Sequence, residues 1–215
     1  MKTILKKTGI IIGIMLFFIS WSLPISAQLI DGSKIGIKGG ANLSNLFVKD
    51  VSTENIKVGW EAGFFLKAAL TSSFAIQPEL LYSTKGAELT YNNSVVGKAL
   101  FSLNYVELPV LAVFNLSDNI NLHVGPYLGY LTQATAANKT NGHYDFQKEV
   151  DVNNFKPFDW GVAAGIGFEV RWITLGLRYN YGLEYVGKDR AFFGQTYNFP
   201  KGRNSVGQVF IGFSI

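Results

Sequence analysis

Apolar and polar side chains alternate with a period of two along much of this chain, and this alternation is the strongest constraint on its fold. One face of residues 58–70 is entirely apolar and consists of Trp60, Ala62, Phe64, Leu66, Ala68 and Leu70. The opposite face carries both charged residues of the segment, Glu61 and Lys67. Successive residues of a β-strand point to opposite faces, so the pattern predicts a strand with one apolar and one polar face. The same division recurs in residues 158–170, 173–181 and 205–215.

The alternation predicts eight strands, and the connections between them alternate in length. The strands are expected at about residues 34–43, 57–70, 74–85, 100–114, 120–132, 158–170, 172–182 and 205–215. Long connections fall at 44–56, 86–99, 133–157 and 183–204, and short turns fall at 71–73, 117–119 and Arg171. An even strand number with short turns at one rim and long loops at the other is typical of outer-membrane barrels. We therefore predict an all-β fold, an eight-stranded antiparallel up-and-down transmembrane β-barrel.

A soluble lipocalin-like barrel is the rival fold. It would carry apolar side chains inside and polar side chains outside, which is the reverse of a membrane barrel. The charges on the small-residue faces argue against it. Three prolines fall inside predicted strands, where each removes a donor from the hydrogen-bond ladder: Pro78, Pro109 and Pro126. Because they lie at nearly the same height on neighbouring strands, we expect a local row of β-bulges there.

The N-terminus has the features of a secretory signal peptide. Lys2, Lys6 and Lys7 precede an apolar run over residues 9–21, and small residues precede Gln28. The run is shorter than the roughly 20 residues that a membrane-spanning helix needs. We expect cleavage after Ala27, which divides the chain into a signal peptide, 1–27, and a barrel domain, 28–215. Export of this kind places the expected barrel in the cell outer membrane of a Gram-negative bacterium.

Composition excludes several classes of function. Three of the 19 Lys and Arg residues, and none of the 15 acidic residues, lie in the predicted signal peptide, so the exported chain is nearly neutral. A nucleic-acid partner therefore has no compositional support. The chain contains no Cys, which removes disulfides, thiol nucleophiles and cysteine metal ligands together. We expect no cofactor and no metal site.

Three segments resemble a known family. Lys34–Ser44 (KIGIKGGANLS) is similar to the opening strand of the porin-family or PorT-like outer-membrane β-barrel domain common in Bacteroidota. Gln77–Gly86 (QPELLYSTKG) and Tyr105–Leu111 (YVELPVL) resemble the third and fourth strands of that family. The resemblance implies an outer-membrane barrel and allows a role in secretion machinery. It implies no particular activity, and the word porin in the family name is not evidence for a pore.

Seven charged residues are predicted to point into the barrel lumen: Glu61, Lys67, Glu79, Glu107, Asp159, Glu169 and Arg178. An eight-stranded barrel has an interior just wide enough for side chains to fill, so these charges should pair and plug it. We expect Arg178 to be the partner of Glu79 and Glu107, with Lys67 as the second choice. A proton or ion path remains an alternative interpretation. His123, on the lumen-facing register, is expected to be a hydrogen-bonded structural residue rather than a catalytic one.

Aromatic residues sort to two levels of the predicted apolar face, as expected for interfacial girdles. The predicted girdle residues are Trp60, Phe74, Tyr82, Phe114, Tyr130, Trp160, Tyr181 and Phe213. Five further aromatics lie in the fourth long connection. Loops on a rigid scaffold are where recognition usually takes place. These candidates for interaction are Tyr185, Phe192, Phe193, Tyr197 and Phe199.

The function predicted from these features is structural or surface-interacting, and not enzymatic. The expected partners are outer-membrane lipid, lipopolysaccharide and an extracellular or envelope protein bound through the loops, and the barrel is expected to be monomeric. Two alternatives stay open at this point: a narrow porin or small-solute channel, and a component of secretion machinery.

Overall fold

A computed structural model describes most of the chain after the predicted signal peptide. The described residues are 32–48, 54–91, 97–140, 143–149, 152, 155–186, 189–192, 195–198 and 202–215. The predicted signal peptide, 1–27, lies outside them. Within these ranges, no helix has both the length and the apolar character needed to cross a membrane.

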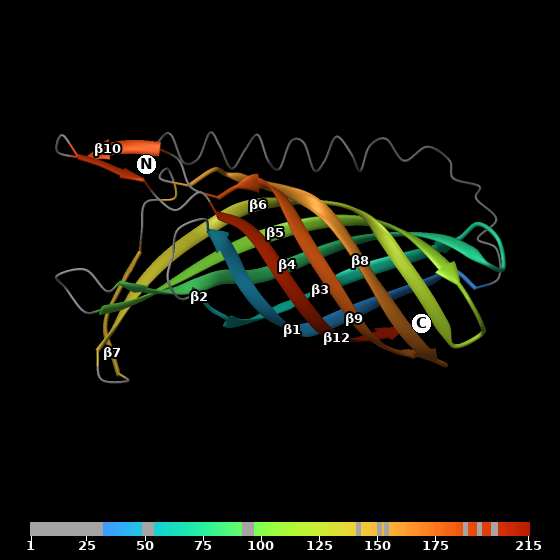
Figure 1. The fold of residues 1–215 in the computed structure, drawn as a ribbon. Helices are drawn as coiled ribbons and strands as arrows, with labels where there is room; N and C mark the ends of the chain where they lie inside the picture. The colour runs from blue at the N-terminus through green and yellow to red at the C-terminus, as the bar shows by residue number, and fades with distance from the viewer. Residues whose placement is uncertain are drawn as a thin grey trace, which may run out of the picture.

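Eight long antiparallel strands form a closed barrel, and they run obliquely to its axis (Figure 1). They are β1 (Lys34–Val48), β3 (Lys57–Ala69), β4 (Phe74–Tyr91), β5 (Gly97–Asn115), β6 (Ile120–Thr140), β8 (Phe158–Val170), β9 (Ile173–Tyr185) and β12 (Gly202–Ser214). Each pairs with the next in this order, and β12 pairs with β1 to close the ring. The predicted eight-stranded antiparallel up-and-down barrel is confirmed.

Four short strands lie in segments that were predicted to be loops. β2 (Glu54–Asn55) pairs with β4, β7 (His143–Glu149) pairs with β6, and β10 (Asp189–Phe192) forms a hairpin with β11 (Gln195–Asn198). β4, β5 and β6 are also longer than predicted at the long-loop end. Backbone N–H and C=O groups need partners, so the neighbouring segments keep pairing where the apolar alternation has already stopped.

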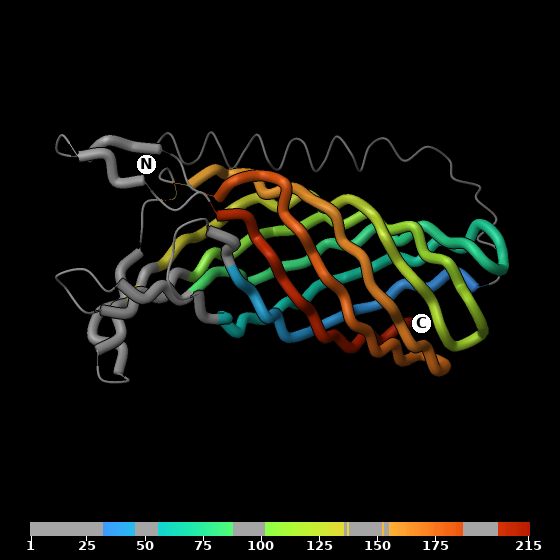
Figure 2. Tube along the Cα trace, in the orientation of Figure 1, coloured from blue at the N-terminus to red at the C-terminus, as the bar shows by residue number. Residues whose placement is uncertain are grey.

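The three short turns lie together at one end of the barrel (Figure 2). At two of them the turn is closed by backbone hydrogen bonds, from Leu70 N to Phe74 O at 2.9 Å and from Leu116 N to Ile120 O at 2.8 Å. At the third, Val170 pairs directly with Ile173. Arg171 there has a φ of 56°, because a two-residue hairpin turn requires a left-handed residue.

The expected row of bulges at the prolines is wrong. Pro78 lies opposite Val110, and Pro109 lies opposite Tyr127, next to Pro126, so the three prolines form a diagonal row. Strand pairing is interrupted at each proline, but the register is the same on both sides. Proline removes a ladder donor without adding a residue, so the interruption needs no bulge.

The two faces of the barrel wall differ as a membrane barrel requires. Large apolar side chains lie on the outside, and Phe64 is 63% exposed, whereas Lys85 on the inside is 0% exposed. A soluble lipocalin-like barrel would show the reverse, so that rival fold is excluded.

Candidate functional site in the barrel lumen

Strand alternation places all seven predicted lumen residues inside the barrel. Six of them are buried: Glu61, Lys67, Glu79, Glu107, Asp159 and Arg178. Glu169 is half-buried near the short turns. They do not form one network around Arg178. Instead they divide among three clusters along the barrel axis, and each cluster includes a lysine that was not among the seven.

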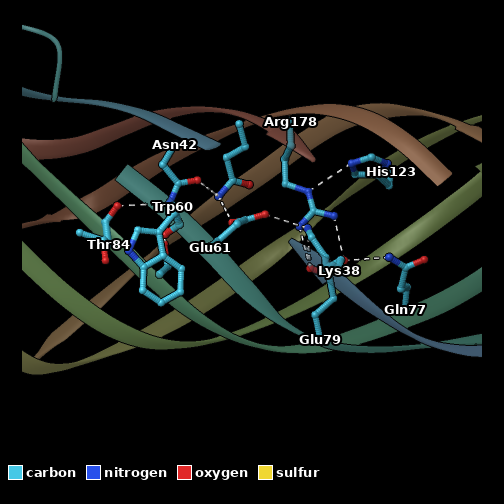
Figure 3. Close-up of polar contacts among 11 residues, drawn as sticks. Lys38, Asn42, Trp60, Glu61, Gln77, Glu79, Thr84, His123 and Arg178 are labelled. Carbon is cyan, nitrogen blue, oxygen red and sulfur yellow. Dashed lines mark hydrogen bonds and ion pairs between the residues drawn. The ribbon is translucent and has the colours of Figure 1, made fainter. Parts of the chain in front are cut away.

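The central cluster consists of Lys38, Glu61, Glu79 and Arg178 (Figure 3). Arg178 on β9 donates two parallel hydrogen bonds to Glu79 on β4, at 2.7 and 2.8 Å. Lys38 on β1 lies 3.1 Å from Glu61 and 3.3 Å from Glu79. Two cations thus meet two carboxylates, which is the condition under which buried charges are retained.

Hydrogen bonds define the state of His123 beside this cluster. Arg178 Nε–H donates to His123 Nε2 at 3.2 Å, and His123 Nδ1 lies 3.3 Å from Asn121 Oδ1. Because guanidinium has no acceptor, Nε2 must be the unprotonated nitrogen and Nδ1 must carry the proton. This neutral imidazole orients Arg178 toward Glu79.

Uncharged side chains complete the hydrogen bonding of Glu61. Gln208 Nε2 donates to Glu61 Oε2 and also to Asn42 Oδ1, the latter at 3.2 Å. The Asn42 amide in turn donates to Ser83 Oγ at 3.0 Å. This chain joins β12, β1, β3 and β4, so it fixes four strands through side chains as well as through the backbone ladder.

The long-loop cluster consists of Lys57, Lys85, Glu107 and Asp159. Lys85 Nζ lies 2.5 Å from Glu107 Oε1 and 3.1 Å from Asp159 Oδ2, and Lys57 Nζ donates to Lys85 O at 3.2 Å. Asp159 Oδ2 also accepts from Asn204 Nδ2 at 2.9 Å. The partner of Glu107 is therefore Lys85, and the expectation that Arg178 would serve both Glu79 and Glu107 is wrong for Glu107.

The mouth cluster lies at the short-turn end and consists of Lys34, Lys67 and Glu169. Lys67 Nζ is 2.6 Å from Glu169 Oε1, and Lys34 Nζ is 3.0 Å from Glu169 Oε2. Asn121 Nδ2 also donates to Glu169, at 2.8 Å. A cavity of about 20 Å³ lies against this cluster, lined by Lys34, Lys38, Lys67, His123 and Glu169 among others. It has room for about one water molecule.

Sequence reasoning missed Lys38 and Lys85, although the signal for both was present. Lys38 lies between Ile37 and Gly39, so a period of two places it on the lumen face when Ile35, Ile37 and Gly39 face outward. Lys85 shares the lumen face of β4 with Glu79, but it lay at the predicted end of that strand. The strand continues to Tyr91, so Lys85 is deep inside the barrel rather than in a loop.

The predicted girdle residues all lie on the outward face. Trp60, Tyr130 and Trp160 are 52%, 42% and 47% exposed. Neighbouring rings touch at both levels: Trp60 and Tyr82 have centroids 5.5 Å apart near the long loops, and Phe74 and Phe114 are 5.2 Å apart near the short turns. The remaining two, Tyr181 and Phe213, are also exposed.

The loop candidates are described only in part. Tyr185 is exposed at the end of β9, and the guanidinium carbon of Arg203 lies 4.8 Å from its ring centre. Phe192 ends β10 and Tyr197 lies in β11. Phe193 and Phe199 lie outside the described residues. At the same rim, Lys156 donates to Glu184 and so holds the pKa of that carboxyl below its usual range.

Comparison with known proteins agrees with this architecture. Residues 26–186 match the model of a family described as an outer membrane protein beta-barrel domain. The solved structure of Neisserial surface protein A (NspA) is 13% identical, with 86% of this chain and 100% of that chain covered and a TM-score of 0.50. Ail, the attachment invasion locus protein of Yersinia pestis, is 11% identical, with 85% and 99% covered and a TM-score of 0.49. At such identities the likeness to NspA concerns the fold. No protein of curated function matches the sequence.

Proposed function

We propose a role for this chain that starts from its membership of the family of outer membrane protein β-barrel domains, which makes it an outer-membrane barrel protein. Its barrel is a closed anchor for a recognition surface at the long-loop end. The proposal rests on the ion-paired lumen. Under this proposal the lumen does not conduct ions, the protein has a structural or surface-interacting role, and it has no catalytic activity.

The clusters support closure because their bonds cross the lumen. β4 and β9 are opposite strands of the eight-membered ring, and Glu79 and Arg178 join them. β3 and β8 are also opposite, and Lys67 and Glu169 join them near the short turns. Any ion passing through would have to separate these pairs, at the cost of leaving buried charges without partners.

Apolar side chains support closure toward the long loops. A buried cluster lies beyond Lys85 and consists of Ala87, Leu103, Tyr105, Leu131, Ala134, Phe155 and Val186. Tyr105 joins the two regions, since Lys85 Nζ lies 5.4 Å from its ring centre. Water and ions are poorly accommodated in such a cluster, so it would act as a second seal.

Planar-bilayer recording of the purified full chain tests closure. We expect no steady conductance from barrels whose folded state is shown by their gel mobility before and after boiling. A reproducible, ion-selective open state of the unaltered protein would overturn the proposal.

A narrow porin or small-solute channel is the second candidate, and the cavity at the short-turn end favours it. That cavity would be the entrance of a pore that opens when the two inner clusters separate. Gly129 offers a test, because the atoms nearest to an added Cβ there would be Asp159 O and Tyr105 Cδ1, both at 3.4 Å. If an open state exists, Gly129→Leu should narrow it and lower its conductance, whereas a closed anchor has no current to lower.

The recognition surface is proposed to include Tyr185 and the β10–β11 hairpin, with Phe192 and Tyr197. Loops and hairpins on a rigid barrel can bind an extracellular or envelope protein without changing the barrel itself. Arg203, on the outward side of β12 beyond Tyr181, would in addition contact a lipopolysaccharide phosphate. Reconstitution of the protein and of Arg203→Gln with and without lipopolysaccharide tests this contact, since only the unaltered protein should gain thermal stability from it.

The PorT-like resemblance keeps a role in secretion machinery as a further alternative. Its basis is the similarity of Lys34–Ser44, Gln77–Gly86 and Tyr105–Leu111 to strands of that family. Deletion of the gene with measurement of secreted proteins separates this role from surface recognition. An unchanged set of secreted proteins would count against the secretion role.

A further inference from the structure

Among the three clusters of described lumen residues, the mouth cluster is the one in which positive charge exceeds negative charge. In the central cluster, Lys38 and Arg178 balance Glu61 and Glu79. In the long-loop cluster, Lys85 contacts both Glu107 and Asp159, and Lys57 donates to the carbonyl oxygen of Lys85, so two lysines accompany two carboxylates. In the mouth cluster, by contrast, two lysines share the single carboxylate of Glu169.

We propose that the cavity at the mouth cluster binds a small inorganic anion of the size of chloride. Lys34, Lys67 and Lys38 all line this cavity, and it lies where the surplus charge lies. An anion there would neutralise the mouth cluster in the way that the carboxylates neutralise the other two. Buried charge is retained chiefly when it is compensated, which is the physical reason for the site.

Each of the two lysines of the mouth cluster has an N–H donor beyond those used in its hydrogen bonds to described residues. An ammonium group carries three donors. Lys67 Nζ has two acceptors among the described residues, Glu169 and Asn115. Lys34 Nζ likewise has two, Glu169 and the carbonyl oxygen of Arg171. Each lysine can therefore donate one further hydrogen bond to an anion in the cavity.

The size of the cavity selects the ligand. Its volume of about 20 Å³ accepts a particle close to a water molecule in size. A halide ion meets this limit, whereas phosphate, sulfate or a carboxylic acid would require the walls to move. The rings of Phe65 and Phe210 form the apolar part of the lining, beside its lysines. Barrels of this kind have their short turns in the periplasm, so the site would sample periplasmic chloride.

Unfolding of the full chain by urea in detergent tests the site, with sodium chloride compared against sodium gluconate at equal ionic strength. Chloride should stabilise the barrel. At a chloride concentration ten times the dissociation constant, the folding equilibrium constant should rise about 11-fold. Lys67→Met should abolish this difference. Lys156→Met, which removes a lysine from the outer rim, should preserve it.

Two further measurements keep the proposal falsifiable if Lys67→Met does not fold. Lys34→Met alters the exposed side of the site and should reduce the chloride effect. Crystals of the unaltered protein soaked in sodium bromide should show an anomalous peak in contact with Lys67 Nζ. Equal stability in chloride and gluconate, an undiminished chloride effect in Lys34→Met, or a bromide-soaked crystal without that peak would each overturn the proposal.

Discussion

Arg178 and Glu79 bind each other across the full width of the barrel, through two hydrogen bonds of 2.7 and 2.8 Å. They are 99 residues apart in sequence and lie on opposite strands, β9 and β4. Backbone hydrogen bonds join each strand only to its two neighbours, whereas this pair joins strands that share no edge. The bidentate geometry also restricts the rotation of both side chains, so the pair acts as a crossbar inside the barrel.

Replacement of Arg178 by Met should weaken the fold strongly. Glu79 would keep Lys38 and Gln77 as partners but lose both bonds from the guanidinium group. Breaking a buried ion pair by removing one partner typically costs about 3–5 kcal/mol. Urea titration in detergent, followed by the change in gel mobility on unfolding, measures the loss.

The double variant Arg178→Met/Glu79→Gln is the matched control. It removes the uncompensated carboxylate together with the cation, so much of the lost stability should return. Equal stability of the single and double variants would show that the single variant is not weakened by an unpaired Glu79.

Side-chain alternation predicted the strands and the lumen face of each one, because a period of two assigns every residue of a strand to one side. Together with the alternating connection lengths it predicted the barrel. It put Glu79 and Arg178 on the same face of strands that proved to be opposite in the ring. It could not assign partners correctly throughout. Glu107 binds Lys85, and that pairing depends on β4 continuing past residue 85 to Tyr91.

The strand extensions were missed because they do not rest on side-chain pattern. β7 pairs with β6 through residues 135–140, where apolar alternation has ended. Backbone hydrogen bonding pairs these segments, and it carries little sequence signal. The same limit applies to the mouth cavity, whose lining comes from several strands that meet only once the barrel closes.

Lys85→Met should be more damaging than any substitution of a rim lysine. It would leave Glu107 and Asp159 facing each other without the ammonium group that lies between them. We expect a loss of about 3–5 kcal/mol in urea unfolding. Lys156→Met removes a partly exposed partner of Glu184 and should cost about 0–1 kcal/mol. Similar losses for both variants would contradict the burial of the long-loop cluster.

The loss of stability caused by an arginine on the outward face should depend on its depth in the membrane. Ala164 lies on the exposed face near the middle of β8, so Ala164→Arg should destabilise the barrel by about 2–4 kcal/mol in lipid bilayers. Val58 lies on the same outward surface but beyond Trp60, and is 68% exposed. Val58→Arg should cost about 0–1 kcal/mol. Folding titrations in bilayers of one lipid measure the two losses of stability. Equal losses would show that the depths assigned to Ala164 and Val58 in the membrane are wrong.

Alanine variants of two lumen glycines should respond differently to the shortening of Phe210. A Cβ at Gly176 would lie 2.2 Å from Cζ of Phe210, whereas a Cβ at Gly63 would lie 2.0 Å from the carbonyl oxygen of Leu80. Both Gly176→Ala and Gly63→Ala should therefore cost about 1–3 kcal/mol, as overpacking of a filled interior does. A side chain can be shortened but a backbone carbonyl cannot, so Phe210→Leu should restore stability to Gly176→Ala and not to Gly63→Ala. Double-mutant cycles of urea midpoints measure the coupling of Phe210 to each glycine. If the coupling to Gly63 were as large as the coupling to Gly176, Phe210 would not be the side chain that fills the space above Gly176.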